Sequence, residues 1–135
     1  MKRYLFALVV VFLFSACAST VYIPDDLSPA EIIQRAQEAL DRNRYHVATQ
    51  YYEALLERYR HSIDLVITAE YHIAFIHYKQ GRYDQARTEM NILLGYYNSP
   101  DAELLPQHFR RLAHIVLERI DEKENQRRLF SKNRQ

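Results

Sequence analysis

Residues 78–86 read YKQGRYDQA, and residues 41–48 read DRNRYHVA. Each stretch places a turn-forming residue, Gly81 or Asn43, before an arginine, a tyrosine, two further residues and an alanine. The two alanines, Ala48 and Ala86, are 38 residues apart, and a tyrosine-rich apolar segment accompanies each of them. A recurrence at this spacing is typical of a helical-repeat array, in which each repeat is one supersecondary unit that stacks on the next.

The apolar residues around these two turns recur at helical spacing. They predict five helices that begin near residues 29, 45, 66, 83 and 109 and end near residues 43, 61, 81, 95 and 120. Ser28, with Pro29 next and Glu31 three positions later, is typical of a helix start with a capping box. The sequence contains two glycines, which argues against a turn-rich β fold. We therefore predict an all-α fold of helical hairpins joined by short loops.

Residues 78–86 resemble the centre of the tetratricopeptide (TPR) repeat, in which a tyrosine and an alanine after a glycine turn are signature packing residues. The first copy, with Asn43 at the turn, resembles it more weakly. The resemblance implies a short TPR-like array of about two and a half repeats. It assigns the repeat-packing positions to Ala36, Tyr45, Ala48, Ala74, Gly81, Tyr83 and Ala86.

The first 17 residues, MKRYLFALVVVFLFSAC, have the layout of a secretory signal, with two positive charges, an apolar run and two small residues before a cysteine. About ten apolar residues form roughly 15 Å of helix, half of a hydrocarbon core of roughly 30 Å. The segment resembles the lipobox of bacterial lipoproteins, which implies that Cys17 carries acyl chains such as palmitate after cleavage before it. An ordinary secretory signal is the alternative. Cys17 is the single cysteine, so disulfides play no part in the fold.

These patterns divide the chain into four parts. We expect a lipoprotein signal peptide over residues 1–16, the lipidated Cys17 and a tether over 17–28, a TPR-like helical domain over 29–120, and a charged C-terminal tail over 121–135. The tail either extends the fifth helix or frays.

Residues 56–62 and 94–100, at two predicted helix ends, resemble the corresponding endings in envelope TPR lipoproteins, among them the BamD-like family of the outer-membrane β-barrel assembly machine. The resemblance implies a lipid-anchored scaffold that acts by protein–protein interaction in the assembly of envelope complexes, at the outer membrane and facing the periplasm. An adaptor of a pilus, secretion or division complex is the alternative. A small-ligand-binding or enzymatic envelope protein is a third hypothesis.

The TPR resemblance also implies that the first helix of each repeat lines a concave surface. Mapped onto this chain, the partner-binding groove comprises Tyr71, Phe75, Tyr78, Lys79 and Phe109. Rigid aromatic side chains are good anchors for a peptide or helix laid in a groove. The alternative is that these rings pack inside the domain or mediate self-association.

Other functional classes receive little support from the sequence. Without Lys2 and Arg3 the chain has 16 basic and 17 acidic residues, a balance that does not indicate nucleic-acid binding. His72 and His77 are five residues apart, which does not place both rings on one helix face as a metal site requires. We expect His77 in a helix interface, the other histidines in solvent, and no cofactor, metal or catalytic centre, because no phosphate-binding loop or nucleophile motif is present.

Replacing Cys17 with serine tests the lipid anchor. Serine cannot accept the thioether-linked diacylglycerol, so the anchor and its apolar burial are lost. We expect Cys17→Ser to move the protein from the membrane fraction to the soluble fraction, as measured by fractionation and immunoblotting. Unchanged retention in the membrane fraction would show that the anchor is not at this residue.

Overall fold

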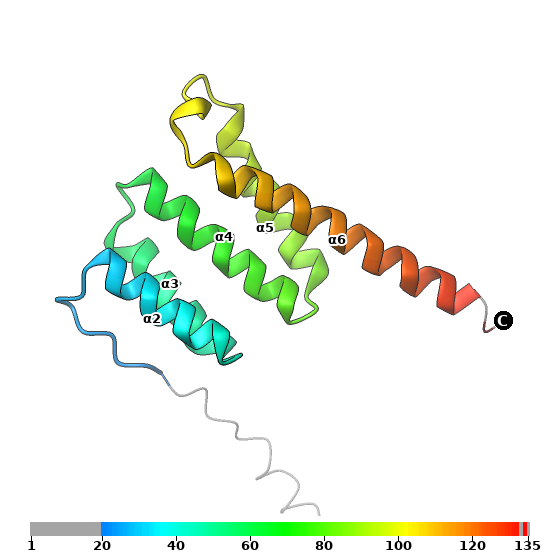
Figure 1. The fold of residues 1–135 in the computed structure, drawn as a ribbon, viewed down its shortest axis with the longest axis horizontal. Coiled ribbons are helices and arrows are strands. Elements are labelled where there is room, and N and C mark those ends of the chain that lie inside the picture. The colour runs from blue at the N-terminus through cyan, green and yellow to red at the C-terminus, as the bar shows by residue number, and fades with distance from the viewer. Residues whose placement is uncertain (1–19, 133, 135) are drawn as a thin grey trace, which may run out of the picture.

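The computed structural model describes residues 20–132 and residue 134, and every regular element among these residues is a helix (Figure 1). The all-α prediction is therefore confirmed for this part of the chain, while the predicted signal peptide and Cys17 lie outside it. The elements are, in chain order, α2 (Pro29–Asp41), α3 (Tyr45–Arg58), α4 (Ile63–Lys79), α5 (Tyr83–Gly95), the 3₁₀ turns η1 (Tyr96–Asn98) and η2 (Ala102–Leu104), and α6 (Gln107–Lys132).

The start of α2 follows from its sequence. The Ser28 hydroxyl accepts a hydrogen bond from the Glu31 N–H (3.4 Å), and the Glu31 carboxylate accepts one from the Ser28 N–H (2.9 Å). This is the predicted capping box, and it satisfies two backbone donors that the first turn leaves free. The helix α4 begins three residues earlier than the apolar periodicity predicts, at Ile63, because Ser62 supplies an extended N-cap residue.

The hairpins α2–α3 and α4–α5 are closed by the same turn. Asn43 and Gly81 both have positive φ, 55° and 76°, a conformation that glycine and asparagine adopt most readily. Each follows the end of a helix, and the residue after it donates its N–H to a carbonyl five residues earlier. These two bonds are Arg44 to Ala39 (2.8 Å) and Arg82 to His77 (2.9 Å). The turn geometry therefore recurs at the same 38-residue spacing as the sequence pattern.

The helix α4 is buried on two sides and lies in the middle of the row of helices (Figure 1). Ile67 and Ala74 pack into one core with α5 and α6. Ala69 and Ile76 pack into a second core with α2 and α3. Because one helix belongs to both cores, the position of α4 fixes how the two hairpins are stacked.

Small side chains occupy the helix contacts. The alanines assigned to repeat packing are all fully buried, and they are Ala36, Ala48, Ala74 and Ala86. The two tyrosines of that set, Tyr45 and Tyr83, are half-buried at the starts of α3 and α5. Interiors are packed at crystal-like density, so a larger side chain at these alanines has no room.

The segment expected to be a tether lies against the domain over the residues that the structure describes. We call residues 20–27 the strap. The Val21 N–H donates to Gln50 Oε1 (2.7 Å), and the Arg58 guanidinium donates to the carbonyls of Ile23 (2.9 Å) and Pro24 (2.8 Å). The strap has no regular secondary structure, and these hydrogen bonds from α3 hold it against the domain.

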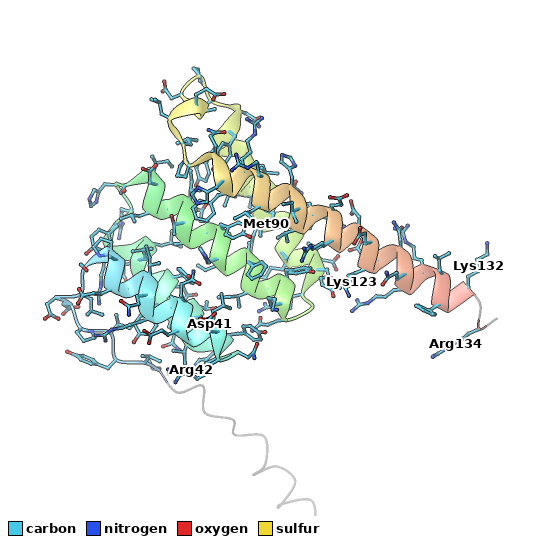
Figure 2. The ribbon with its side chains drawn as sticks, in the orientation of Figure 1. Asp41, Arg42, Met90, Lys123, Lys132 and Arg134 are labelled. Carbon is cyan, nitrogen blue, oxygen red and sulfur yellow. The ribbon has the colours of Figure 1, made fainter. Side chains whose placement is uncertain are left out.

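The helix α6 continues through most of the charged C-terminal tail. Residues 121–132, expected as a charged tail, continue it without a break to Lys132. Figure 2 shows Lys132 and Arg134 at its tip, which extends past the other helices. Of the two outcomes expected for the tail, the structure shows extension of the helix, and side-chain contacts hold this polar segment.

Two contacts hold the polar half of α6 against α5. The Arg87 guanidinium forms ion pairs with Asp121 (2.7 Å) and Glu124 (2.9 Å). One turn further on, the Arg127 guanidinium lies over the ring of Tyr83, 4.9 Å from its centroid. Cation–π and ion-pair contacts of this kind stabilise a partly exposed helix by modest amounts each.

Introducing a charge at Ala86 tests the hairpin packing. Ala86 is fully buried, so an arginine there places an unpaired charge in the core. We expect Ala86→Arg to lower the free energy of unfolding by about 3–5 kcal/mol, measured by urea denaturation. The matched control is Thr88→Arg, two residues along the same helix and exposed, which should change stability by about 0.5 kcal/mol or less. Equal stability of the two variants would contradict the packing described above.

Candidate functional site

A groove lies between α4 and α6, and we call it the α4–α6 groove. Helix α4 contributes Phe75 and Tyr78, and α6 contributes Leu112, Ile115 and Arg119. Leu112 and Ile115 are 38% and 44% exposed, which is high for large apolar side chains. The three α6 residues were not predicted as part of the site, although their spacing of three and four residues marks a second face of that helix.

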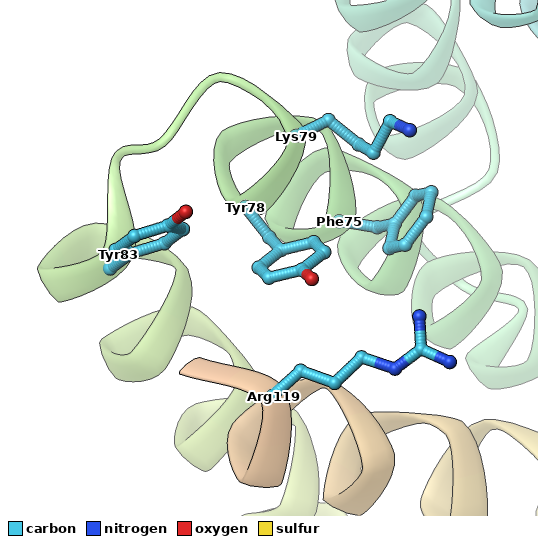
Figure 3. A pocket seen from close by; sticks show the side chains of 5 residues that line it. All are labelled: Phe75, Tyr78, Lys79, Tyr83 and Arg119. Carbon is cyan, nitrogen blue, oxygen red and sulfur yellow. The ribbon is translucent and has the colours of Figure 1, made fainter. Parts of the chain in front are cut away.

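Aromatic rings line the α4 side of the groove in a continuous row. The ring centroids of Tyr71 and Phe75 are 6.0 Å apart, those of Phe75 and Tyr78 are 5.9 Å apart, and those of Tyr78 and Tyr83 are 5.9 Å apart. These separations lie in the range in which aromatic pairs attract. The last three rings of the row are visible in Figure 3. The row is therefore a preformed surface, held by contacts between its own members.

Two of the predicted groove residues belong to the core. Tyr71 and Phe109 are each 6% exposed, and their ring centroids are 5.0 Å apart. They pack α4 against α6 in the core, and of the two only Tyr71 also lines the groove, so their expected role as open partner contacts needs correction. Phe75 and Tyr78 remain half-buried, and Lys79 is exposed.

Two cations flank the aromatic row. Lys79 and Arg119 line the same hollow as Phe75, Tyr78 and Tyr83, with the rings between the two charged side chains (Figure 3). Among the residues that the structure describes, neither cation is in an ion pair with a carboxylate. Burial raises the pKa of Tyr71, and the nearby Arg119 charge acts in the opposite direction. The groove thus offers apolar contact and positive charge together.

The size of the groove indicates the class of ligand. Its two hollows have volumes of about 260 and 270 Å³. Pockets that enclose small molecules usually have about 300–1,000 Å³ and bury most of the ligand. Both hollows are open to solvent and adjoin along the row of rings, a shape that suits successive side chains of a polypeptide laid across them.

A polar cluster lies between α4 and α5, at a separate hollow of about 150 Å³ outside the groove. Tyr96 donates its hydroxyl proton to Glu70 Oε1 (3.2 Å), while Glu70 Oε2 is buried without a hydrogen-bond partner. Burial raises the pKa of Glu70, and the Tyr96 bond only partly offsets this. Nearby, Glu89 bonds His77 Nδ1 (2.6 Å) and accepts from Gln85 (2.9 Å). His77 is 8% exposed, in the helix interface where the sequence analysis places it.

A set of hydrogen-bonded side chains links α2, α3 and α4. Gln37 donates to the Tyr52 hydroxyl (2.7 Å) and lies 2.8 Å from His72 Nε2, while His72 Nδ1 lies 2.7 Å from the Thr68 carbonyl. These partners fit a neutral His72 that donates from Nδ1 and accepts at Nε2. Burial lowers the pKa of His72. The expectation that this histidine is solvated is wrong, because its ring stacks on Tyr52 with centroids 4.7 Å apart.

Neither a metal centre nor a membrane span is found in the described part of the chain. Across residues 20–132 and 134, no three side chains of the metal-ligating types come together. None of the helices there combines the length and the apolarity needed to cross a bilayer.

Comparison with known proteins gives one informative relative. A protein of Treponema pallidum (strain Nichols), described as "Uncharacterized protein", is 33% identical to the chain over 118 residues. The match covers 85% of this chain and 47% of the relative, so the chain spans about half the length of the protein it matches. No family model and no solved structure matches the chain.

Replacing Glu70 with glutamine tests the buried carboxylate. In the folded state the pKa of Glu70 is above the ordinary value of 4.5, so the folded protein favours the protonated carboxylic acid. The free energy of unfolding therefore decreases as the pH rises through the pKa of the folded state. Glutamine keeps an acceptor for Tyr96 and has no charge to bury. We expect Glu70→Gln to melt at a higher temperature than the parent at pH 7 and to differ little from it at pH 4, as measured by circular dichroism.

The control for this prediction is Glu53→Gln on an exposed face of α3, which should leave the melting temperature unchanged at both pH values. A lower melting temperature for Glu70→Gln at pH 7 would mean that the ionised carboxylate stabilises the fold.

Proposed function

We propose that the protein is a membrane-anchored, TPR-like scaffold lipoprotein that holds a partner segment in the α4–α6 groove. The observation that carries this proposal is the row of aromatic rings on the rim and floor of the groove, flanked by Lys79 and Arg119. The groove residues bring apolar surface and positive charge, and they form no nucleophile–base pair. We accordingly assign the protein a binding role without catalysis.

The TPR-like assignment is supported by the recurrence of one turn. The hairpins α2–α3 and α4–α5 end their first helix with the same hydrogen-bond pattern around Asn43 and Gly81. Fully buried alanines, Ala48 and Ala86, follow the turns at equal distances. In this proposal α6 is the first helix of a third repeat, which is why its inner face packs on α4 and α5.

The chemistry of the groove predicts the chemistry of the partner. Phe75, Tyr78 and Leu112 suit apolar side chains, and the two unpaired cations suit a carboxylate beside them. We therefore propose a partner segment that presents apolar residues together with an aspartate or glutamate, laid along α4.

The proposed location is the bacterial cell envelope. It depends on acylation of Cys17, and Ala18 at the next position favours the outer membrane with the domain in the periplasm. Within that location the proposed role is assembly of an envelope complex, with the β-barrel assembly machinery as the first candidate. A pilus, secretion or division complex is the second candidate, because an anchored adaptor with one groove suits any of these assemblies.

Affinity capture from native membranes tests the proposal. The full chain is purified in mild detergent beside Phe75→Ala/Tyr78→Ala, and the captured proteins are identified by mass spectrometry. Buried aromatic anchors contribute about 2 kcal/mol or more to an interface, which corresponds to an affinity loss of about 30-fold. We expect the double variant to lose the partner while it keeps its helical circular dichroism spectrum.

Two further variants make the result specific. Ile92→Ala/Leu104→Ala removes exposed apolar side chains outside the groove and should retain the partner. Lys79→Glu/Arg119→Glu changes exposed residues only, so the fold is preserved, and it should lose the partner by charge repulsion. Full recovery of the partner by both groove variants would show that the groove is not the binding site. The captured proteins distinguish the β-barrel assembly machinery from pilus, secretion and division complexes.

A further inference from the structure

The last turns of α6 have a composition unlike the rest of the helix. Residues 125–135 read NQRRLFSKNRQ, with four basic residues and no acidic residue, whereas acidic residues are interspersed through residues 118–124. We call residues 127–132 the α6 end; it contains Arg127, Arg128 and Lys132, and Arg134 follows it. Positive charge is therefore concentrated in residues 125–135, whereas the remaining residues have 14 basic and 17 acidic side chains.

The α6 end also exposes two large apolar side chains. Leu129 is 64% exposed and Phe130 is 73% exposed. Arg127 lies over Tyr83, the first residue of α5, so the turns after Arg127 extend past the start of α5. The side chains at this tip stand clear of the other helices (Figure 2).

The orientation of the helices places the α6 end on the same side of the bundle as the first residues of the strap. Successive helices run in opposite directions. The N-termini of α3 and α5 and the C-terminus of α6 therefore lie at the same end of the helical bundle. The Val21 N–H donates to Gln50 in the N-terminal half of α3, near that end. Cys17 is three residues before Thr20, and three residues span at most about 10 Å. An acyl anchor at Cys17 therefore holds this side of the domain close to the bilayer.

We infer that the α6 end is a second membrane contact, which binds the interface of a bilayer that contains anionic phospholipid. Aromatic and leucine side chains insert at the level of the headgroups, and lysine and arginine beside them are attracted to anionic lipids. A basic patch beside apolar side chains adds to the membrane binding that the acyl chains provide. The inference deepens the proposed function and rests on it for the position of the anchor.

The absence of tryptophan from the chain gives a direct test. Phe130→Trp places a single tryptophan in the α6 end, and Leu104→Trp places one in η2, just before the start of α6, where the side chain is 81% exposed. Each full-length variant is reconstituted into vesicles of phosphatidylethanolamine and phosphatidylglycerol that carry doxyl-labelled lipid. We expect blue-shifted, doxyl-quenched emission from Phe130→Trp and water-like, unquenched emission from Leu104→Trp.

Charge reversal supplies the matched control. Arg128→Glu/Lys132→Glu in the Phe130→Trp background should abolish the quenching, and so should high salt, which screens exposed charges. Arg60→Glu/Arg111→Glu changes the net charge equally at the other end of the bundle and should leave the quenching intact. Quenching that survives reversal at Arg128 and Lys132 would overturn the inference. So would a blue shift that depends on protein concentration without vesicles, because it would assign the α6 end to a second copy.

Flotation of the vesicles separates this inference from the proposed anchor. If Phe130→Trp floats with the vesicles but is not quenched, the α6 end does not contact lipid and the anchor stands. If Cys17→Ser floats as the parent does even in high salt, which screens the contact of the α6 end, the anchor assignment fails, while quenching of Phe130→Trp at low salt still supports the lipid contact.

Discussion

The requirement that α4 bury two opposite faces governs the whole domain. It is the most apolar of the described helices, and its residues enter both hydrophobic cores. A helix buried on both sides cannot carry a continuous polar face, which explains why its polar side chains, Glu70, His72 and His77, are held by partners on neighbouring helices. The strap, both hairpins and α6 are arranged around this helix.

The candidate groove depends on the same packing. Its two walls belong to different hairpin units, and the contact between Tyr71 and Phe109 sets their separation. The rings that remain half-buried, Phe75 and Tyr78, continue from the core toward the surface. A site built in this way is rigid on the α4 side, and its width responds to any shift of α6. Stability of the core and the shape of the binding surface are therefore linked.

The sequence predicted the features that depend on local signals. The capping box of Ser28 and Glu31 and the turns at Asn43 and Gly81 depend only on residues close in the sequence. The start of α2, the two hairpin turns and the all-α class could therefore be predicted. The features that it did not predict depend on pairings between distant residues. Arg58 holds the strap 35 residues away, Arg87 holds the polar half of α6, and Gln37 recruits His72 across 35 residues. The burial of Tyr71 and Phe109 also needed the position of α6, which no local pattern supplies.

The sharing of α4 between two cores has a consequence for folding. Each helix contacts its neighbours in the row, so the chain gains stability by local additions, as in a one-dimensional stack. Two cores with no common element would unfold independently. Because α4 belongs to both cores, unfolding of one core removes packing partners from the other. Amide hydrogen exchange in such a molecule is slowest in the central helix and becomes faster toward both ends of the row. The domain therefore frays from its margins, at the strap and at the tip of α6, and keeps its centre until global unfolding.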